Sequence, residues 1–439
     1  MMLSGWGRYP RAECRVITPR ERADVLAALG KQISLIARGN GRSYGDSALN
    51  PDATLAMRHS DRFIAFDPAN GILEAESGTL LSDVLETFVP RGWFPAVTPG
   101  TKFVTLGGMI AADIHGKNHH KAGSFGTYVE SLDLALADGR VLRCSRSENA
   151  DLFEATLGGM GLTGVILSAR VRLQPIETAY IRQETLRARN LDEVMALFEA
   201  SRDWTYTVAW VDCVAKGSAL GRALLYRGEH ARVDDLPEGK RAAPLAPNHK
   251  RTRRMPLDLP DWLLNRWSVA AFNQLYYFYA ATGTALIDYD TFFYPLDAIL
   301  EWNRIYGRSG FVQYQCVLPK DSSRAGLTAL LGRVGISGTG SFLSVLKLLG
   351  PGRGMLSFPI EGYTLALDFR ADRESLALLY ELDSIVVSHG GRIYLAKDAR
   401  MAPGMLRQGY SGLEVFEAAR EAADPGRKFA SMQSRRLGL

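Results

Sequence analysis

The segment from Gly107 to Gly126, GGMIAADIHGKNHHKAGSFG, decides more of the fold than any other part of the chain. A glycine pair follows an apolar approach, and His115, Lys117 and His119 then stand among small residues. Glycines let the backbone approach a ligand closely, and imidazole and ammonium groups supply donors that can face an anion. We therefore expect this segment to form loops beside a ligand. A glycine-rich surface loop with solvated basic residues is the alternative.

A second glycine-rich stretch, ARGNGRSYGD at residues 37–46, follows a short apolar run. It does not match the dinucleotide fingerprint, because Tyr44 stands where the third glycine is needed. Pro51, in an Asn-Pro turn, argues against a helix directly after the loop, so a helix N-terminus is not the expected phosphate site. The loop itself can hold a pyrophosphate through its backbone N–H groups and the Arg42 guanidinium.

Together these stretches and LGGMGLTGVI (157–166) resemble the FAD-binding half of the vanillyl-alcohol oxidase superfamily. Within that superfamily the chain resembles the decaprenylphosphoryl-ribose 2'-oxidase family, whose members oxidise a lipid-linked ribose on the way to arabinose. The similarity extends over nearly the whole chain. Outside the glycine-rich stretches it is carried by SGWGR (4–8), EWNRIYG (301–307), QYQCVLP (313–319), SFLSVLKLLGP (341–351), LSFPI (356–360) and YLAKDAR (394–400).

The resemblance implies an α+β fold. A two-part FAD-binding domain would occupy residues 1–178, and a substrate domain with an antiparallel sheet and flanking helices would occupy residues 179–391. The C-terminal segment, 392–439, would return to the FAD domain. The residues themselves also show a change of character after Gln174-Pro175, where the chain becomes richer in aromatic side chains.

The resemblance also implies FAD as the cofactor. Binding would be non-covalent, because Arg42 stands where many relatives in the superfamily carry a histidine that bonds to the flavin. The positions that match the family's cofactor-binding residues are Gly39, Asn40, Gly41, Arg42, Ser43, Tyr44, Gly100, Thr101, Thr105, Gly108, Ala112, His115, Gly116, Asn118, Gly161, Ile166, Tyr394, Ala396 and Lys397.

Catalytic and substrate-binding positions follow from the same match. Lys397 would stabilise the negative charge that the flavin gains on accepting hydride, and an exposed lysine at a strand end is the alternative. His115 would act as the base or as a hydrogen-bonding orienter, two roles that the sequence does not separate. Neighbouring His119 and His120 need not both face the site. The catalytic set is Lys397, His115, Tyr44 and Gln315, and the substrate-binding set is Lys117, Trp210, Gln315, Lys347 and Ala366, of which Ala366 replaces the active-site cysteine of actinobacterial members.

The implied reaction oxidises polyprenylphosphoryl-β-D-ribose to the 2'-keto sugar by hydride transfer to flavin N5. A separate NAD(P)-dependent reductase would then complete the route to the arabinose of a cell-envelope polysaccharide. One alternative keeps the flavin and changes the substrate to a free sugar or an aldonolactone, as in D-arabinono-1,4-lactone oxidases. A second alternative is a non-catalytic flavin-binding membrane adaptor, which would have no reason to keep a polar sugar pocket.

Amino-acid composition further narrows the class of protein to which this chain can belong. Hydrophobic content of 46% and charged content of 23% are typical of a soluble globular protein. The four cysteines show no metal or disulfide spacing, so we expect no metal. No apolar run approaches the ~20 residues of a membrane span, and the first ten residues lack the apolar core of a signal peptide. A location in the cytoplasm or peripheral at the inner membrane is expected.

The net charge of +5 is unevenly distributed. A basic, proline-containing segment without apolar periodicity is interpreted as a loop. A solvated loop, contact with an anionic membrane surface and nucleic-acid binding are the three readings, and the last lacks any recognition motif. We therefore expect no nucleic-acid partner. The basic residues are Lys240, Arg241, Lys250, Arg251, Arg253 and Arg254.

Local patterns predict several elements. Asn70-Gly71 and Asp138-Gly139 indicate hairpins, and apolar spacing indicates helices over Pro19 to Gly30 and Leu80 to Val89. Alternation over 165–173 predicts a strand. An aromatic cluster at helical spacing is expected to be mostly core, with part lining the entrance for a lipid-linked substrate. Its members are Trp262, Trp267, Phe272, Tyr276, Tyr277, Phe278 and Tyr279.

Overall fold

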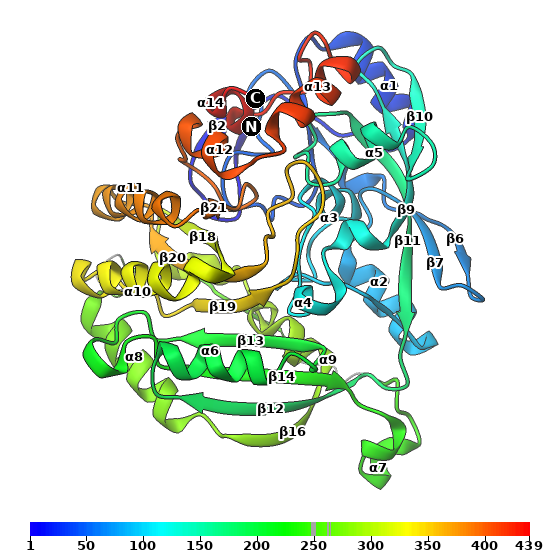
Figure 1. Ribbon diagram of the computed structural model, residues 1–439. Helices are drawn as coiled ribbons and strands as arrows, with labels where there is room; N and C mark the ends of the chain where they lie inside the picture. The colour runs from blue at the N-terminus through cyan, green and yellow to red at the C-terminus, as the bar shows by residue number, and fades with distance from the viewer. Residues whose placement is uncertain (247–251, 261–262, 264) are drawn as a thin grey trace.

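The computed structural model describes residues 1–246, 252–260, 263 and 265–439. Two antiparallel sheets and the helices around them form the bulk of these residues (Figure 1). The predicted α+β class is confirmed. The N- and C-termini lie side by side at the top of the molecule in Figure 1.

The N-terminal half contains a small parallel sheet and a larger antiparallel one. The small sheet has the order β3 (Val16–Ile17), β5 (Thr54–Ala56), β4 (Ile36–Arg38). The larger sheet has the order β10-β9-β11-β7-β6, and β8 also pairs with β11. Its strands are β6 (Phe63–Asp67), β7 (Ile72–Glu76), β8 (Trp93–Pro95), β9 (Val129–Ala135), β10 (Val141–Ser145) and β11 (Val165–Pro175).

Several predicted elements are confirmed. Both hairpins form, and Gly71 and Gly139 occupy the left-handed backbone region that the two turns require. Helix α2 (Leu81–Phe88) buries the apolar face that its spacing predicts. Helix α1 (Arg22–Lys31) begins later than expected, because Glu21 is its N-cap residue and forms a capping box with Asp24.

The second sheet has eight strands in the described chain, in the order β16-β12-β14-β13-β19-β20-β18-β21. Each neighbouring pair is antiparallel. Helices α6, α10 and α11 cover one face (Figure 1). The strands are β12 (Tyr180–Ala188), β13 (Tyr206–Val211), β14 (Ala223–His230), β16 (Gly283–Asp288), β18 (Phe311–Pro319), β19 (Ser344–Leu349), β20 (Gly362–Arg370) and β21 (Arg392–Ile393), and the helices are α6 (Leu191–Ala200), α10 (Lys320–Ser337) and α11 (Arg373–Ser388).

The C-terminal segment contacts the N-terminal sheet. Leu35 and Phe429 form a parallel bridge, and Arg436 pairs with Asp46. The helices of this segment are α12 (Pro403–Gly409), α13 (Leu413–Ala423) and α14 (Met432–Leu437). Short elements complete the described chain: β1 (Met2–Ser4), β2 (Arg11–Glu13), α3 (Leu106–Ala111), α4 (His119–Ala122), α5 (Ala150–Thr156), α7 (Glu238–Arg241), β15 (Arg253–Arg254), α8 (Arg266–Tyr279), α9 (Tyr289–Phe293) and β17 (Ile299–Leu300).

The expectation that residues 107–126 form loops is wrong for about half of them. Helix α3 starts the segment, and α4 lies near its end. The physical reason is a cap and an apolar stripe: the Thr105 hydroxyl accepts from the Gly108 N–H, and Leu106, Met109 and Ile110 are buried at helical spacing.

The loop interpretation of the basic segment is also wrong at both ends. Lys240 and Arg241 lie in helix α7, and the 253–254 pair forms β15, which pairs with β17. Lys250 and Arg251 lie outside the described residues.

The aromatic cluster is not mostly core. Tyr277 is buried, but Trp267, Phe278 and Tyr279 of the same helix are exposed. The apolar side chains surround nearly the whole of α8, so their spacing did not fix which side faces inward. Trp262 lies outside the described residues. None of the helices in the described ranges is long and apolar enough to cross a membrane.

Candidate active site

A cavity of about 770 Å³ lies where the two halves of the chain meet. The loop after β4 and the segment 98–117 line it on one side. Strands β13, β18, β19 and β20, followed by residues 394–397, line it on the other. Segments far apart in the sequence therefore share one site.

The structure brings together all but one of the residues that the sequence assigned to cofactor, catalysis or substrate. Asn118 is the exception: it is buried outside the cavity lining, and its amide donates to the Ala96 carbonyl at 2.8 Å. The predicted residues that line the cavity are Gly39, Asn40, Gly41, Arg42, Ser43, Tyr44, Gly100, Thr101, Thr105, Gly108, Ala112, His115, Gly116, Lys117, Gly161, Ile166, Trp210, Gln315, Lys347, Ala366, Tyr394, Ala396 and Lys397.

The loop after β4 presents free backbone donors. The N–H groups of residues 40–43 have no acceptor within the described part of the chain. Two carbonyl–amide contacts hold the loop in place, from the Trp6 N–H to the Ser43 carbonyl and from the Tyr44 N–H to the Ala396 carbonyl. A run of backbone N–H groups facing a cavity binds phosphate oxygens well, so this loop fits the pyrophosphate of a dinucleotide.

Two features support the same fit. The Arg42 guanidinium carbon lies 3.9 Å above the centre of the Trp6 ring, and its buried Nε has no partner among the described residues. Gly39 lies so close to Thr105 that a Cβ would stand 2.2 Å from the threonine Oγ1. The loop thus combines a buried cation with a backbone that has no room for a side chain.

His115 is held in one tautomer. The Gln315 amide nitrogen lies 3.0 Å from Nε2 of the imidazole. An amide nitrogen donates only, so Nε2 accepts and the ring proton resides on Nδ1. That Nδ1 is buried without a partner among the described residues. Burial, followed by the charges of Lys347, His119 and Lys397, holds the His115 pKa well below its usual range, so the ring is neutral.

Asp113 fixes the turn that carries His115. Its buried carboxylate accepts hydrogen bonds from the Ser124 hydroxyl, the Gly126 N–H and the Ser357 hydroxyl. The neighbouring histidines form hydrogen bonds with backbone groups: the Gly350 N–H donates to Nδ1 of His119, and Nε2 of His120 lies 2.9 Å from the Trp204 carbonyl. The residues between Asp113 and Gly126 therefore hold a fixed shape around His115.

Four sheet residues form one row across the cavity wall. Trp210 on β13 pairs with Val345 on β19, Val345 pairs with Ala366 on β20, and Ala366 pairs with Gln315 on β18. Side chains of directly paired residues point to the same face of a sheet. The row therefore places an indole, an alanine methyl group and an amide side by side, and Lys347, two residues after Val345, follows on the same face.

Three half-buried lysines line the cavity. Burial lowers the Lys117 pKa to about 7, with Lys347 contributing, and lowers the Lys347 pKa to about 8. Burial also lowers the Lys397 pKa to about 7, against the opposing effect of Asp368. The Lys117 ammonium donates to the Phe292 carbonyl and lies 4.3 Å above the Phe292 ring. Three amines with depressed pKa values in one cavity create a site for an anion, whose binding would restore the charge of the amines that it contacts.

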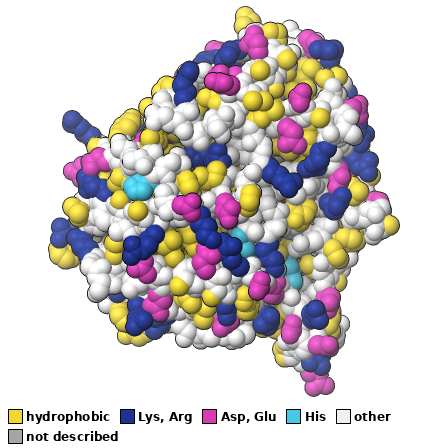
Figure 2. All heavy atoms as spheres, in the orientation of Figure 1, with side chains coloured by type: hydrophobic (Ala, Val, Ile, Leu, Met, Phe, Trp, Pro, Cys, Tyr) yellow, Lys and Arg dark blue, Asp and Glu magenta, His cyan; other side chains and the backbone are white. Residues whose placement is uncertain are grey.

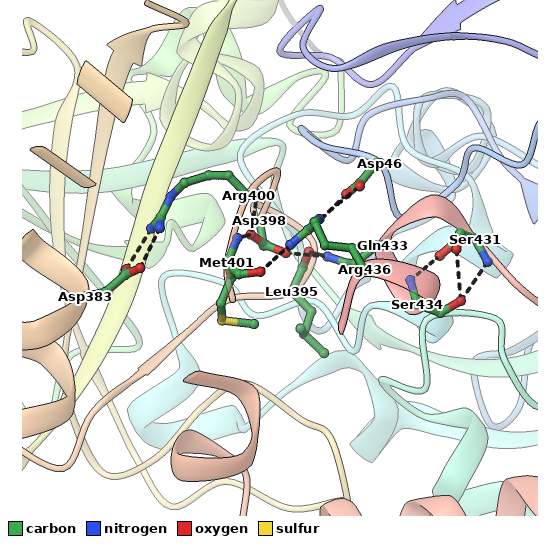
Figure 3. Close-up of polar contacts among 10 residues, drawn as sticks. All are labelled: Asp46, Asp383, Leu395, Asp398, Arg400, Met401, Ser431, Gln433, Ser434 and Arg436. Atoms are coloured by element: carbon green, nitrogen blue, oxygen red, sulfur yellow. Dashed lines mark hydrogen bonds and ion pairs between the residues drawn. The ribbon is translucent and has the colours of Figure 1, made fainter. Parts of the chain in front are cut away.

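The segment that carries Lys397 is fixed from behind by the C-terminal helix (Figure 3). The Arg436 guanidinium donates to both Asp46 and Asp398 at 2.8 Å. Gln433 donates to the Leu395 carbonyl at 2.8 Å. In front of this support, Nζ of Lys397 lies 3.7 Å above the centre of the Tyr44 ring. The ammonium is therefore positioned by an aromatic ring and by a buried ion-pair network.

Sequence reasoning missed two residues near Lys397. Gln313 lines the cavity and donates to Asp368 at 2.6 Å. Asp368 is fully buried, and burial raises its pKa to about 7. Gln313 and Gln315 share a face of β18, and Asp368 follows Ala366 on the same face of β20. The alternation of a strand was the signal that could have found them.

Cys316 lies on the opposite face from Gln315, as the alternation predicts. Its thiol is fully buried, and burial raises its pKa to about 12. A thiol of this kind is not a nucleophile at neutral pH.

Comparisons with known proteins agree with this geometry. Residues 14–145 match the family model of an FAD binding domain. The whole chain aligns with 97% of decaprenylphosphoryl-β-D-ribose oxidase from Mycolicibacterium smegmatis at 36% identity. An uncharacterized Streptomyces coelicolor protein is 38% identical over 82% of this chain and all of its own length. Mouse L-gulonolactone oxidase is 32% identical over only 40% of this chain and 41% of its own length.

The full-length similarity, the FAD-binding match and the cradle of free N–H groups agree with one another. The chain is an FAD-dependent oxidoreductase, and it belongs to the decaprenylphosphoryl-β-D-ribose oxidase family.

Proposed function

We propose that this enzyme oxidises the 2'-hydroxyl carbon of polyprenylphosphoryl-β-D-ribose to a ketone, a step toward polyprenylphosphoryl-arabinose. The observation that carries the proposal is the pairing, within one cavity, of the N–H cradle at residues 40–43 with the polar sheet wall. It is supported by the 36% identity to decaprenylphosphoryl-β-D-ribose oxidase along the whole chain. The cradle would hold the FAD pyrophosphate, and bound FAD supplies the hydride acceptor.

The sheet wall, together with Lys117 from the opposite side of the cavity, would hold the substrate. The ammonium groups of Lys117 and Lys347 offer charge to the substrate phosphate, and the Trp210 ring offers a flat surface to the sugar. The Gln315 amide is fixed by His115 and by the Thr364 hydroxyl, so it can orient the sugar hydroxyls.

Lys397 would accept the proton of the substrate hydroxyl group. With a pKa of about 7, its amine is neutral in roughly half of the molecules at neutral pH and can accept the hydroxyl proton. The ammonium that results lies against the Tyr44 ring and opposes the negative charge that develops in the cavity. His115 is less suited to the role of base, because Nε2 is engaged by Gln315 and Nδ1 carries the proton.

The direct test mixes the purified holoenzyme, without oxygen, with polyprenylphosphoryl-ribose and separately with aldonolactones. We expect the lipid-linked ribose to bleach the flavin absorbance and the lactones to leave it unchanged. Bleaching by an aldonolactone alone would overturn the proposal in favour of a sugar-lactone oxidase. No bleaching by any of them would favour a non-catalytic flavin protein.

Two wider expectations accompany this function. We propose that a separate NAD(P)-dependent reductase consumes the keto sugar, and that the enzyme contacts a membrane surface to reach its lipid-linked substrate. Adding a candidate reductase and NADPH to the oxidation reaction tests the first: nucleotide oxidation should depend on the presence of both proteins.

The cofactor should be non-covalent, since a guanidinium such as that of Arg42 offers no nucleophilic nitrogen for a stable flavin bond. Acid precipitation should release the FAD intact into the supernatant. Flavin that remains in the washed pellet would contradict this expectation.

A further inference from the structure

Helix α8 turns an apolar face to solvent. Six of its fourteen residues are large apolar or aromatic side chains that are exposed. Trp267 is 70% exposed and Tyr279 is 83% exposed. Exposed apolar residues grouped on one element mark an interaction surface more often than scattered ones do. The six are Trp267, Phe272, Leu275, Tyr276, Phe278 and Tyr279.

The orientation of α8 is fixed by the stripe that it buries. Val269, Asn273 and Tyr277 follow one another at intervals of four residues and face the protein. The Asn273 amide donates to Asp212 at 2.9 Å, and the Tyr277 hydroxyl donates to the Ala188 carbonyl at 3.2 Å. A surface helix normally buries its apolar stripe and exposes its polar one. Here the hydrogen bonds of the buried stripe keep aromatic side chains outside.

The exposed side chains divide into two groups. Phe272 and Tyr276 line the cavity, and the Tyr276 ring lies 4.8 Å from the ring of Trp210. Trp267, Leu275 and Phe278 do not line the cavity and point outward. The helix therefore forms part of the cavity wall with one flank and a continuous apolar surface with the next. A lipid chain that leaves the cavity would meet this surface first.

The charge around α8 is positive. Arg266 is exposed in the first turn of the helix, and its guanidinium lies 4.4 Å above the Trp267 ring. Near the other end, the Arg187 guanidinium donates to the Phe278 carbonyl at 3.1 Å, and that of Arg222 lies 5.7 Å above the Phe278 ring. The molecule is not uniformly basic, because the face drawn in Figure 2 mixes charged side chains of both signs among the apolar ones, as an ordinary soluble surface does. Trp and Tyr rings flanked by arginines are the side chains that settle at a lipid headgroup layer.

We propose that the outward face of α8 is the docking surface for an anionic lipid bilayer. Trp267, Leu275 and Phe278 would enter the headgroup layer, and the neighbouring arginines would contact lipid phosphates. The sugar end of a lipid-linked substrate then reaches the cavity past Phe272 and Tyr276, and its chain stays in the bilayer. This inference rests on the proposed function for the lipid-linked nature of the substrate.

The test compares the holoenzyme with two triple variants in sedimentation with vesicles of phosphatidylcholine containing phosphatidylglycerol. The first variant carries Trp267→Ser, Leu275→Ser and Phe278→Ser. The matched control carries Ile33→Ser, Ile64→Ser and Val415→Ser, three exposed apolar side chains distant from α8. We expect the first variant to bind vesicles at least roughly tenfold more weakly and the control to bind as the unchanged enzyme does.

A soluble substrate separates the surface from the chemistry. Both triple variants should reduce their flavin at the unchanged rate with a ribose phosphodiester that carries a short isoprenoid chain. Equal vesicle binding by both variants would overturn the docking proposal and leave the proposed function intact. Failure of the unchanged enzyme to oxidise either substrate would overturn the proposed function whatever the vesicles show.

Two further measurements distinguish docking to lipid from misfolding of the variant and from binding to a second copy of the chain. In the unchanged enzyme, brominated lipids should quench part of the tryptophan fluorescence, and Trp267→Phe should remove that part. Equal quenching in both proteins would contradict the docking proposal. A dimer that dissociates in the first triple variant, without any change in vesicle binding, would instead assign this face to a second copy of the chain.

Discussion

The two walls of the cavity bind by different means. The loop at residues 39–44 offers backbone N–H groups, which any sequence of the right shape could supply. The sheet wall, with residues 394–397, offers side chains, namely two lysines, two amides and an indole, and Lys117 adds a third amine from the opposite side. Backbone donors keep the same charge at every pH, whereas amines with lowered pKa values do not. Binding at the first wall therefore depends on the shape of the backbone, and binding at the second depends on side-chain charge. Substitutions and changes of pH should affect the two kinds of binding differently.

The largest effect is expected from adding a methyl group to the backbone wall. In Gly39→Ala the new Cβ would stand 2.2 Å from Thr105 Oγ1, so the loop must shift and its N–H groups would no longer converge. Overpacking of this kind costs up to about 3 kcal/mol, so FAD should bind up to roughly 150-fold more weakly. Flavin fluorescence during dilution measures the affinity.

Gly100→Ala is the matched control. Gly100 also lines the cavity, but its added Cβ would meet nothing within 4 Å. Its FAD affinity should stay within about twofold of the unchanged enzyme. Equal losses in the two variants would show that shape at Gly39 is not what the loop depends on.

Removing one charge from the sheet wall should affect reduction rather than cofactor binding. Lys397→Met keeps most of the side-chain stem and deletes the amine above the Tyr44 ring. If that amine accepts the proton and opposes developing negative charge, flavin reduction should slow roughly tenfold or more, at least ~1.4 kcal/mol of lost transition-state stabilisation. Stopped-flow absorbance gives the rate, and FAD content should be unchanged. An unaltered rate would remove Lys397 from the chemistry.

The pH dependence of ligand affinity tests the same difference between the two walls. An anionic ligand favours the ammonium forms of Lys117 and Lys347, so their pKa values in the complex rise above the free values of about 7 and about 8. Affinity for an anion is then complete below pH 7 and falls as the pH rises from 7 toward the pKa of the complex. We expect a loss of up to roughly tenfold between pH 7 and 8 for a substrate analogue.

Calorimetric titration of the holoenzyme measures this dependence, and proton uptake on binding is the accompanying signature. FAD affinity, which we attribute to the backbone wall, should change much less over the same range. A flat profile for the analogue would mean that these lysines keep their charge in the free enzyme.

The difference between the walls also explains what the sequence could predict. Recognition of a ligand by backbone N–H groups requires glycines, which form motifs that are visible in the sequence. Each of the predicted positions in the loop after β4 lines the cavity. Side chains brought together by strand pairing leave a weaker signal. Gln313 lies in the matching stretch QYQCVLP but was given no role, Asp368 lies in none of the quoted stretches, and only the register of β18 and β20 places them beside Lys397. The orientation of α8 could not be predicted, because apolar residues on nearly every side of a helix do not show which stripe is buried.

The smallest effect is expected at Ala366, the alanine of the sheet wall. In the family, nitroaromatic inhibitors are reduced by the enzyme to nitroso compounds, which the active-site cysteine traps. Ala366 lines this cavity and has no lone pair with which to attack, so inhibition should be fully reversed by dialysis. Cys316 adjoins Gln315 but lies on the other face of β18, buried and with a pKa raised to about 12.

Intact-mass spectrometry after turnover should therefore find no adduct. The variant Ala366→Cys should gain one, because its thiol would enter the cavity beside Gln315. An adduct mapped to Cys316 in the unchanged enzyme would mean that β18 exposes its other face during turnover.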